Sequence, residues 1–216
     1  MILKYLFTTG CMLIFFSANT FSQQDWTLKQ DNEGIKVYTK DMGNSPFKAI
    51  KTVCTIESSL TRLTAVLLDI NSSTDWVYAT KSCKLLAQSS PAELVYYSEV
   101  EVPWPASNRD FIVSLKVSQD KKSKAVTVTG ENRKDYLPVN KNIVRIPQSY
   151  SKWYIQPLQK GQVQIEYILQ VDPGGMVPAW LINLFAARGP FESFKNLRKQ
   201  VKKDIYNRVK IDFITD

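Results

Sequence analysis

The 216-residue sequence contains no histidine. This absence removes the commonest general base of enzymes, the Ser-His-Asp and Cys-His nucleophilic arrangements, and every histidine ligand for a metal ion. Cysteine is rare: beyond Cys11 the chain has Cys54 and Cys83, whose separation matches no zinc-binding spacing. These two cysteines could pair or remain as free buried thiols. We expect neither a metal nor a cofactor.

Glycine is also scarce, with eight residues in the chain. The adjacent Gly174-Gly175 is not followed by the Lys-Ser/Thr pair of a phosphate-binding loop. Beyond residue 22 there is no apolar run long enough to cross a bilayer, no internal repeat and no linker-like segment. Residues 23–216 are therefore predicted to form one domain.

Residues 1–22 differ in character from the rest of the chain. They carry one early positive charge, Lys4, and an apolar run over 6–18 that is short for a membrane span. The small residues Thr20 and Ser22 suit a cleavage site, so residues 1–22 are predicted to be a secretory signal peptide. An uncleaved anchor is the alternative. We expect the mature protein to be periplasmic or secreted.

Basic residues outnumber acidic ones, 28 to 20, which gives a net charge of +8 and favours anionic partners. A basic run, KNLRKQVKK, occupies residues 195–203. It is typical of the solvated face of an amphipathic helix or of a surface that meets anionic lipid headgroups. No nucleic-acid-binding motif accompanies it. We expect a monomer that makes transient contact with an anionic membrane surface and binds no nucleic acid.

Hydrophobic periodicity predicts an α+β fold. Strands are expected at 34–40 and 47–56, followed by a helix over 60–70 that Ser58 or Ser59 caps. Alternating apolar and polar residues predict further strands at 80–88, 93–102, 109–119, 124–131, 143–157 and 162–171.

The chain is predicted to end in a long helix that starts near Pro178 and carries an apolar stripe, with Gly189-Pro190 as a point of bending. The order of elements suggests a curved antiparallel sheet wrapped around this helix. Glu99 and Glu101 share one face of their strand, but that face is the polar one, so a catalytic carboxylate pair is disfavoured.

The segment EVPWPASNRDFIV interrupts two predicted strands. Pro103 and Pro105 lack a backbone donor and cannot continue a strand ladder, so they should force a bend. Asn108 tolerates a turn conformation, and the adjacent Arg109 and Asp110 can tie the corner through side-chain hydrogen bonds. We interpret these five residues as a mainly structural motif.

Two segments resemble a known family. YYSEVEVPWPASNRDFIV, and further on DPGGMVPAWLINLFAARGPFESFKNLRKQV, are similar to motifs of the START lipid-transfer domains, especially the phosphatidylcholine-transfer branch. The resemblance extends over nearly all of residues 26–203. It implies a helix-grip fold, in which the sheet and the C-terminal helix enclose a tunnel for one lipid.

The resemblance also bears on the ligand. Members that bind phosphatidylcholine have an arginine and an acid at the positions of Ser73 and Val77, and sterol-binding members have an arginine at the position of Leu115. These charges are missing here. A wholly apolar ligand, a fatty acid or a lipid held chiefly by its tails is therefore expected.

Strand parity and the apolar stripe of the last helix select the residues that would face this tunnel, although the same residues could fill a solid core. They are Tyr96, Val100, Val102, Phe111, Val113, Leu115, Tyr167, Leu169, Trp180, Leu181, Leu184 and Phe185.

A gate is expected where the loop over 133–140 meets the start of the last helix. The loop occupies the lid position of the resembled family, and its Tyr136, Leu137 and Val139 are apolar where a plain turn would be polar. The basic run would hold the opening against anionic headgroups.

The function that follows is that of an exported, non-enzymatic lipid-binding or lipid-transfer protein, with a cyclase-like or hydrolase-like helix-grip enzyme as the alternative.

Overall fold

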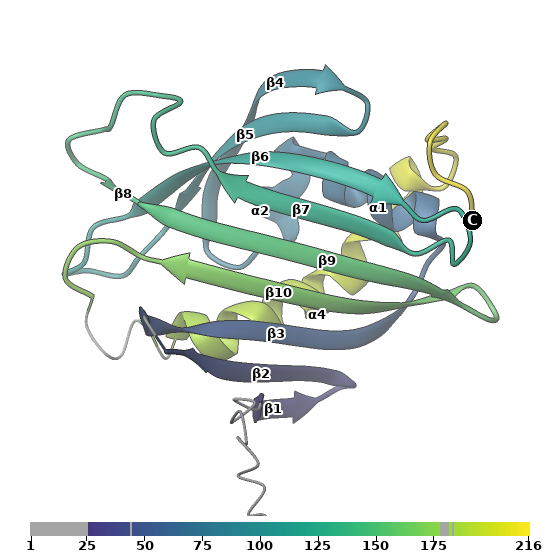
Figure 1. Ribbon diagram of the computed structural model, residues 1–216, viewed down its shortest axis with the longest axis horizontal. Coiled ribbons are helices and arrows are strands. Elements are labelled where there is room, and N and C mark those ends of the chain that lie inside the picture. The colour runs from purple at the N-terminus through teal and green to yellow at the C-terminus, as the bar shows by residue number, and fades with distance from the viewer. Residues whose placement is uncertain (1–25, 44, 178–181, 183) are drawn as a thin grey trace, which may run out of the picture.

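The computed structural model describes residues 26–43, 45–177, 182 and 184–216. A 10-stranded sheet runs in the order β1-β2-β3-β10-β9-β7-β6-β5-β4, with β8 beside β6 (Figure 1). The strands are β1 (Thr27–Asn32), β2 (Ile35–Met42), β3 (Ser45–Glu57), β4 (Thr80–Ser90), β5 (Glu93–Val100), β6 (Arg109–Gln119), β7 (Val126–Asn132), β8 (Val144–Arg145), β9 (Gln148–Leu158) and β10 (Gln162–Asp172).

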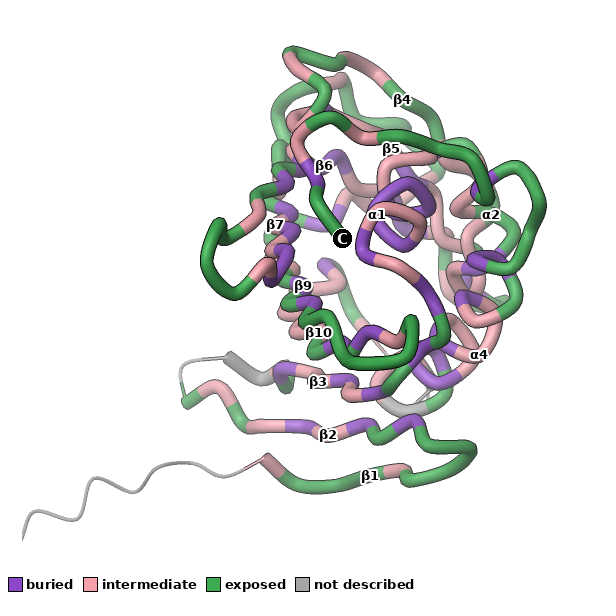
Figure 2. Tube along the Cα trace, turned by 90° about the vertical axis from the view of Figure 1, so that its right-hand side faces the viewer, coloured by how far each residue is buried: buried purple, intermediate pink, exposed green. Residues whose placement is uncertain are grey.

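The helix expected over residues 60–70 is present as α1 (Leu60–Leu68). Ser59 caps it, since its hydroxyl accepts a hydrogen bond of 3.2 Å from the backbone N–H of Arg62. The chain continues through two short turns of helix, η1 (Ile70–Ser72) and α2 (Ser73–Trp76). All three lie against the concave face of the sheet (Figure 2).

The C-terminal helix begins with a π-helical turn, η2 (Leu184–Arg188), and continues as α4 (Gly189–Gln200). The change of geometry falls at Gly189-Pro190, where the sequence predicted an interruption. A short turn, η3 (Asp204–Tyr206), follows. The expected helix start near Pro178 and the predicted signal peptide lie outside the described residues. None of the helices that the structure describes is long and apolar enough to cross a bilayer.

The sheet curls around α1, α2 and α4, which confirms the predicted α+β helix-grip arrangement (Figure 2). α4 buries Phe194 and Leu197 against the concave face, and α1 buries Leu63 and Val66. Each such side chain contributes roughly 1.5–3 kcal/mol of burial free energy. The helices are therefore fixed to the sheet by one continuous apolar core.

The structure differs from the predicted strands in three main ways. The strand expected at 143–157 is divided at Pro147, which has no backbone donor: β8 pairs parallel with β6, and β9 pairs antiparallel with β7 and β10. The strand expected at 93–102 ends at Val100. β1 was not predicted, because its residues are mostly exposed and polar and lack the alternation of a half-buried strand.

Candidate functional site

The inward face of the sheet is defined by cross-strand pairs. Tyr96 on β5 faces Val113 on β6, and Tyr167 on β10 faces Trp153 on β9. Directly opposed residues of an antiparallel pair project to the same side. The strand residues that were predicted to face the tunnel therefore lie together on the concave face. They are Tyr96, Val100, Phe111, Val113, Leu115, Tyr167 and Leu169.

The other members of that set are placed differently. Val102 lies beyond the end of β5 and is buried, with its N–H bound to Asn108 Oδ1 at 3.0 Å. Phe185 on η2 is half-buried, and its ring meets Tyr78 edge to face at 6.2 Å. Trp180 and Leu181 lie outside the described residues. Leu184 belongs to η2, but its side chain is likewise outside the described set.

Burial changes along the concave face. At the end near α1, Val126, Ile155 and Val163 are at most 1% exposed. Toward β8, six apolar side chains on the same face are only half-buried, although Val113 among them is buried: Ile50, Tyr96, Val100, Phe111, Tyr167 and Leu169. The concave face is therefore less tightly covered at this end than near α1.

An aromatic cluster divides the two regions. Trp153 packs against Tyr167 at 4.4 Å, against Phe194 of α4 at 5.2 Å and against Trp76 of α2 at 6.3 Å, measured between ring centroids. The cluster joins the sheet to both helices. It closes the interior on the α1 side and forms the inner wall of the half-buried region.

Several polar atoms in the interior have no protein partner. Thr52 Oγ1 on β3, Trp76 Nε1 and Arg109 Nε are buried and make no hydrogen bond in the described part of the chain. Burial raises the pKa of Tyr96 and of Tyr167 above the usual tyrosine value, so both hydroxyls stay protonated. Buried polar groups are normally hydrogen-bonded, which makes unpaired donors on this face candidates for ligand contact.

Gly130 forms part of the floor of this region. It lies on β7 between Leu115 and Ser151. A Cβ atom at Gly130 would lie 2.5 Å from Ser151 Oγ and 3.1 Å from Val113 Cγ1. A side chain at Gly130 would force these neighbours to shift. Glycine therefore leaves this position of the sheet without a projecting side chain.

Arg145 on β8 connects the loops at the open end of the sheet. Its Nε and Nη2 bind the carboxylate of Asp110 at 2.7 and 3.1 Å, and Nη1 donates to the carbonyls of Lys134 and Leu137. Ion pairs of this forked geometry are among the strongest in proteins. The Arg145 side chain thereby fixes the expected gate loop to β6.

The same short strand contacts two further loops. Val144 N–H donates to Asn108 O at 3.0 Å, and a Cβ at Gly174 would lie 3.2 Å from the carbonyl oxygen of Arg145. Residues 101–108, 133–143 and 172–176 thus meet at β8, and we call these three loops the β8 end.

The proline motif forms the first of these loops. β5 stops at Val100 and β6 starts at Arg109, with a cis peptide bond between Trp104 and Pro105. Pro103 and Pro105 are exposed. Asn108 also donates to Glu99 at 2.7 Å, and Lys81 binds the same carboxylate, so Glu99 is part of a surface network.

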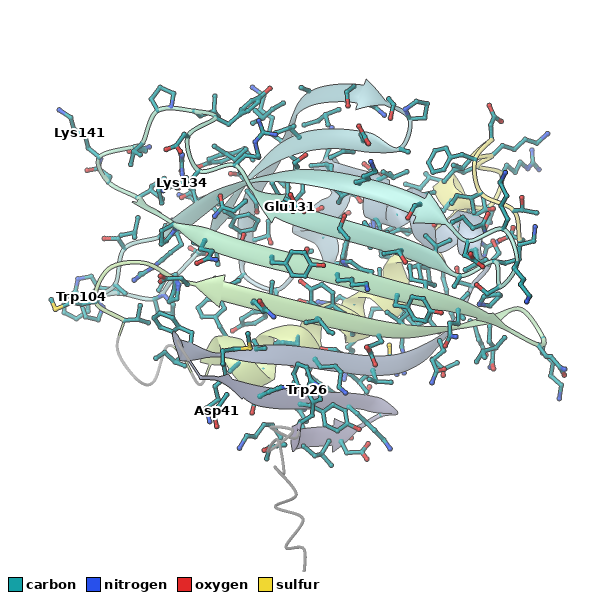
Figure 3. The ribbon with its side chains drawn as sticks, in the orientation of Figure 1. Trp26, Asp41, Trp104, Glu131, Lys134 and Lys141 are labelled. Carbon is teal, nitrogen blue, oxygen red and sulfur yellow. The ribbon has the colours of Figure 1, made fainter. Side chains whose placement is uncertain are left out.

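The gate residues differ in exposure. Tyr136 and Val139 are 42% and 62% exposed, while Leu137 is half-buried. Two apolar side chains at the β8 end are still more exposed and were not predicted from the sequence: Trp104 at 91% and Met176 at 96%. Figure 3 shows Trp104 at the same end of the molecule as Lys134 of the gate loop and Lys141, which follows that loop. The sequence did contain a signal for both residues, since each is a large apolar residue next to proline or glycine in a loop: Trp104 lies between two prolines, and Met176 follows two glycines.

Four cations of the basic run in the last helix bind partners within the protein, and three of these, the lysines, remain partly exposed at the surface. Lys195 pairs with Glu33, Lys202 with Glu57 and Lys203 with Asp75, and Arg198 binds three backbone carbonyls. Their partners lie far away in the sequence. These cations attach α4 and the residues after it to neighbouring parts of the fold.

Two hollows lie away from the half-buried region. One, of about 440 Å³, lies between α1 and the C-terminal segment and is lined by Leu68, Tyr206 and Val209. The other, of about 550 Å³, lies under the gate loop and is lined by Arg133, Tyr136 and other mostly polar residues. Among the residues that the structure describes, no cluster of His, Cys, Asp or Glu could hold a metal ion.

Comparison with known proteins agrees with this geometry. An uncharacterized protein of Pseudomonas aeruginosa, PA1579, is 31% identical over 192 residues, which cover 88% of this chain and 93% of that protein. Phosphatidylcholine transfer protein of Mus musculus is 26% identical over 179 residues, covering 81% of this chain and 83% of that protein.

Solved structures share the fold. The crystal structure of a STAR-related lipid transfer protein from Xanthomonas axonopodis superposes with a TM-score of 0.75 at 31% identity, and covers 82% of this chain and 99% of that one. The model of the START domain matches residues 8–204. Together with the curved sheet that holds α4, this match shows that the chain belongs to the START domain family.

Proposed function

We propose that this protein binds one lipid between the concave face of the sheet and the C-terminal helix, and that it carries the lipid without changing it chemically. The observation on which this rests is the row of half-buried apolar side chains, including Tyr96, Phe111 and Leu169, on the face turned toward the helix. In a solid core these positions would be buried like their neighbours near α1.

The relatives support a lipid as the ligand, because their names describe lipid transfer and phosphatidylcholine transfer. The residues of this chain do not favour a choline head. Ser73 and Val77 are uncharged at the two positions where the resemblance places the choline-lipid charges. We therefore assign lipid binding without choline specificity.

The titratable groups support a carrier over an enzyme. Burial raises the pKa of Cys54 to about 12 and raises those of Tyr96 and Tyr167, so none of the three titrates near neutral pH. Asp110 is the one buried carboxylate of the described chain, and both of its oxygens bind Arg145. A general acid or base needs a pKa near the working pH.

The β8 end is the part of the surface best suited to meet a membrane. Trp104 and Met176 expose large apolar side chains, and Lys134 and Lys141 place positive charge at the same end of the molecule as Trp104 (Figure 3). Aromatic and apolar tips enter the interfacial region of a bilayer, while lysines are attracted to anionic headgroups. The half-buried part of the concave face lies toward the same end, so a lipid would pass there between membrane and protein.

Export is the remaining part of the proposal. It rests on the short apolar run and the small residues before Gln23. N-terminal sequencing of the protein recovered from the periplasm or medium should find a chain that begins at or near Gln23. An intact Met1 in the membrane fraction would contradict export.

Lipid binding is tested by native mass spectrometry of the full chain, both as purified and after incubation with a total lipid extract. We expect one lipid per protein monomer. The identity of the recovered lipid is read by fragmentation, and an unchanged lipid after long incubation supports a carrier. A protein that remains ligand-free in every extract would overturn the proposal, and a chemically altered lipid would favour an enzyme.

A further inference from the structure

Arg109 stands at the β8 end of the concave face. It pairs with Val100 across β5 and β6, and it lies two residues before Phe111 on the same face. Asp110, its neighbour in sequence, projects to the opposite face and binds Arg145. Strand alternation thus separates two residues that the sequence motif places side by side.

The guanidinium of Arg109 is buried but its charge is not balanced. The residue is 5% exposed, and Nη1 donates one hydrogen bond of 2.5 Å to Ser107 O. Nε is buried without a partner, and no carboxylate lies within ion-pairing distance among the described residues. The nearest acids along the two strands are already occupied: Asp110 binds Arg145, and Glu99 binds Lys81 and Asn108.

Arg145 is a useful comparison because it lies in the neighbouring strand. All three of its side-chain nitrogens have partners, two of them on a carboxylate. A single carbonyl, such as that of Ser107, neutralises no charge. If Arg109 served only to hold its own loop, a neutral donor would do so without the large cost of burying an unpaired cation.

We infer that Arg109 binds the anionic head of the lipid, a carboxylate or a phosphate, when the half-buried region is occupied. The inference rests on the proposed function and specifies its ligand. The guanidinium presents a planar fork of donors that matches an oxyanion in two-point contact. Burial lowers the pKa of Arg109 from its usual value, in accord with a site that lacks its counter-charge.

The dimensions of the face suit this orientation. From Arg109 along β6 to Leu115 the inward residues are Phe111, Val113 and Leu115, a distance of about 20 Å at the usual rise per residue. One leaflet of a bilayer has an apolar thickness of about 15 Å, half of the hydrocarbon core. This row of apolar residues is thus comparable in length to the apolar thickness of one leaflet, and an acyl chain laid along it would have its head at the β8 end.

The test uses three probes with one oleyl chain and different heads: oleate, oleyl alcohol and 1-oleoyl-lysophosphatidic acid. Affinities are measured on the full chain by titration below the aggregation limit of each probe, with stoichiometry from native mass spectrometry. The variants are Arg109→Met, which removes the charge, Arg109→Lys, and Arg208→Met, which removes an exposed charge remote from the site. Thermal melts verify folding.

The parent should bind at least one anionic probe about tenfold or more tightly than the alcohol. Arg109→Met should abolish this preference while binding of the alcohol persists, and Arg208→Met should retain it. Whether oleate or lysophosphatidic acid binds more tightly identifies the head as carboxylate or phosphate. If Arg109→Met does not fold, Arg109→Lys provides the test, because loss of the fork should reduce the preference.

Two results would overturn the inference: no preference for an anionic head in the parent, or an unchanged preference in a folded Arg109 variant. Either result leaves the proposed function intact, provided that lipid still binds. The opposite case is also distinguishable. If none of the three probes binds to the parent and no lipid is recovered from extracts, the proposed function itself fails.

Discussion

Asp110 and Arg145 form a buried ion pair across β6 and β8, with Nε 2.7 Å from Oδ1 and side chains that are 1% and 8% exposed. The pair links residues 35 positions apart in the sequence. It also ties the gate loop to the sheet, since Arg145 donates to the carbonyls of Lys134 and Leu137. The pair therefore orders the end of the molecule where the concave face is half-buried.

Asp110→Ala should lower the free energy of unfolding by about 3–5 kcal/mol, because it leaves the Arg145 charge buried without its carboxylate. Urea unfolding followed by circular dichroism measures the change. Glu93→Ala is the matched control: Glu93 of β5 pairs with Lys116 of β6 at 2.8 Å, but at the surface, and its loss should have little effect. Equal effects of the two substitutions would refute the structural role given to Asp110.

Tyr97 should make stability depend on pH in the alkaline range. Burial, and then the negative charges of Asp110 and Glu99, raise its pKa to about 12. The folded state thus keeps the phenol proton that the unfolded chain loses near pH 10. The associated stabilisation is complete below about pH 10 and is lost between about pH 10 and 12.

Thermal melts of the parent and of Tyr97→Phe across this range measure the effect. The phenylalanine variant should lose less stability than the parent between pH 10 and 12. Tyr136→Phe, at an exposed position of the gate loop, is the control. Parallel pH profiles for the parent and Tyr97→Phe would show that Tyr97 does not contribute.

The alternation of apolar residues was sufficient to predict most of the sheet and the side that each strand buries. It placed Tyr96 and Val113 on one face, and their cross-strand pairing agrees with this. What it missed depends on contacts between distant segments. The sequence predicts β8 as the start of β9, because its two residues continue the alternation of apolar and polar residues. Its parallel partner on β6 is remote in sequence.

Adjacency in sequence was misleading at Arg109. The motif suggests that Arg109 and Asp110 act together, although the parity rule that selected Phe111 and Val113 also places Arg109 on their face. Applied consistently, the parity rule would have placed Arg109 and Asp110 on opposite faces of β6. The partners of the basic run could not be predicted in this way, because Glu33, Glu57 and Asp75 come from β-turn, strand and helix positions far from α4.

Replacement of both Cys54 and Cys83 by alanine should leave lipid uptake within a few-fold of the parent. Both thiols are free, and they lie on strands near opposite sides of the sheet. A domain of this size needs no disulfide for stability. Because burial raises the pKa of both thiols, folded protein should react slowly with a thiol reagent at pH 8. Loss of folding in the double variant would contradict this prediction.

Gly130→Ala should destabilise the fold by about 1–3 kcal/mol, since the added Cβ meets Ser151 Oγ at 2.5 Å. Ser151→Ala removes that oxygen, so the double variant should recover most of the lost stability. Chemical unfolding of the four proteins gives the coupling between the two sites. Additive effects would show that the neighbouring Val113, at 3.1 Å from the same Cβ, dominates instead.

Trp104→Ser should slow lipid exchange between vesicles without lowering stability. Trp104 is 91% exposed, so its removal costs no core packing, but an interfacial anchor is lost. A decrease of about tenfold corresponds to about 1.4 kcal/mol of membrane contact. Leu158→Ser is the control, since Leu158 is also an exposed apolar residue but is the last residue of β9, beside the β9–β10 turn and at the other end of those strands from β8. Exchange by the parent should be faster with anionic vesicles and should slow as salt is raised, because Lys134 and Lys141 lie at the same end of the molecule as Trp104 (Figure 3). Equal exchange rates for the parent and Trp104→Ser, with Leu158→Ser as the slow variant, would place the membrane contact at the opposite end of the sheet.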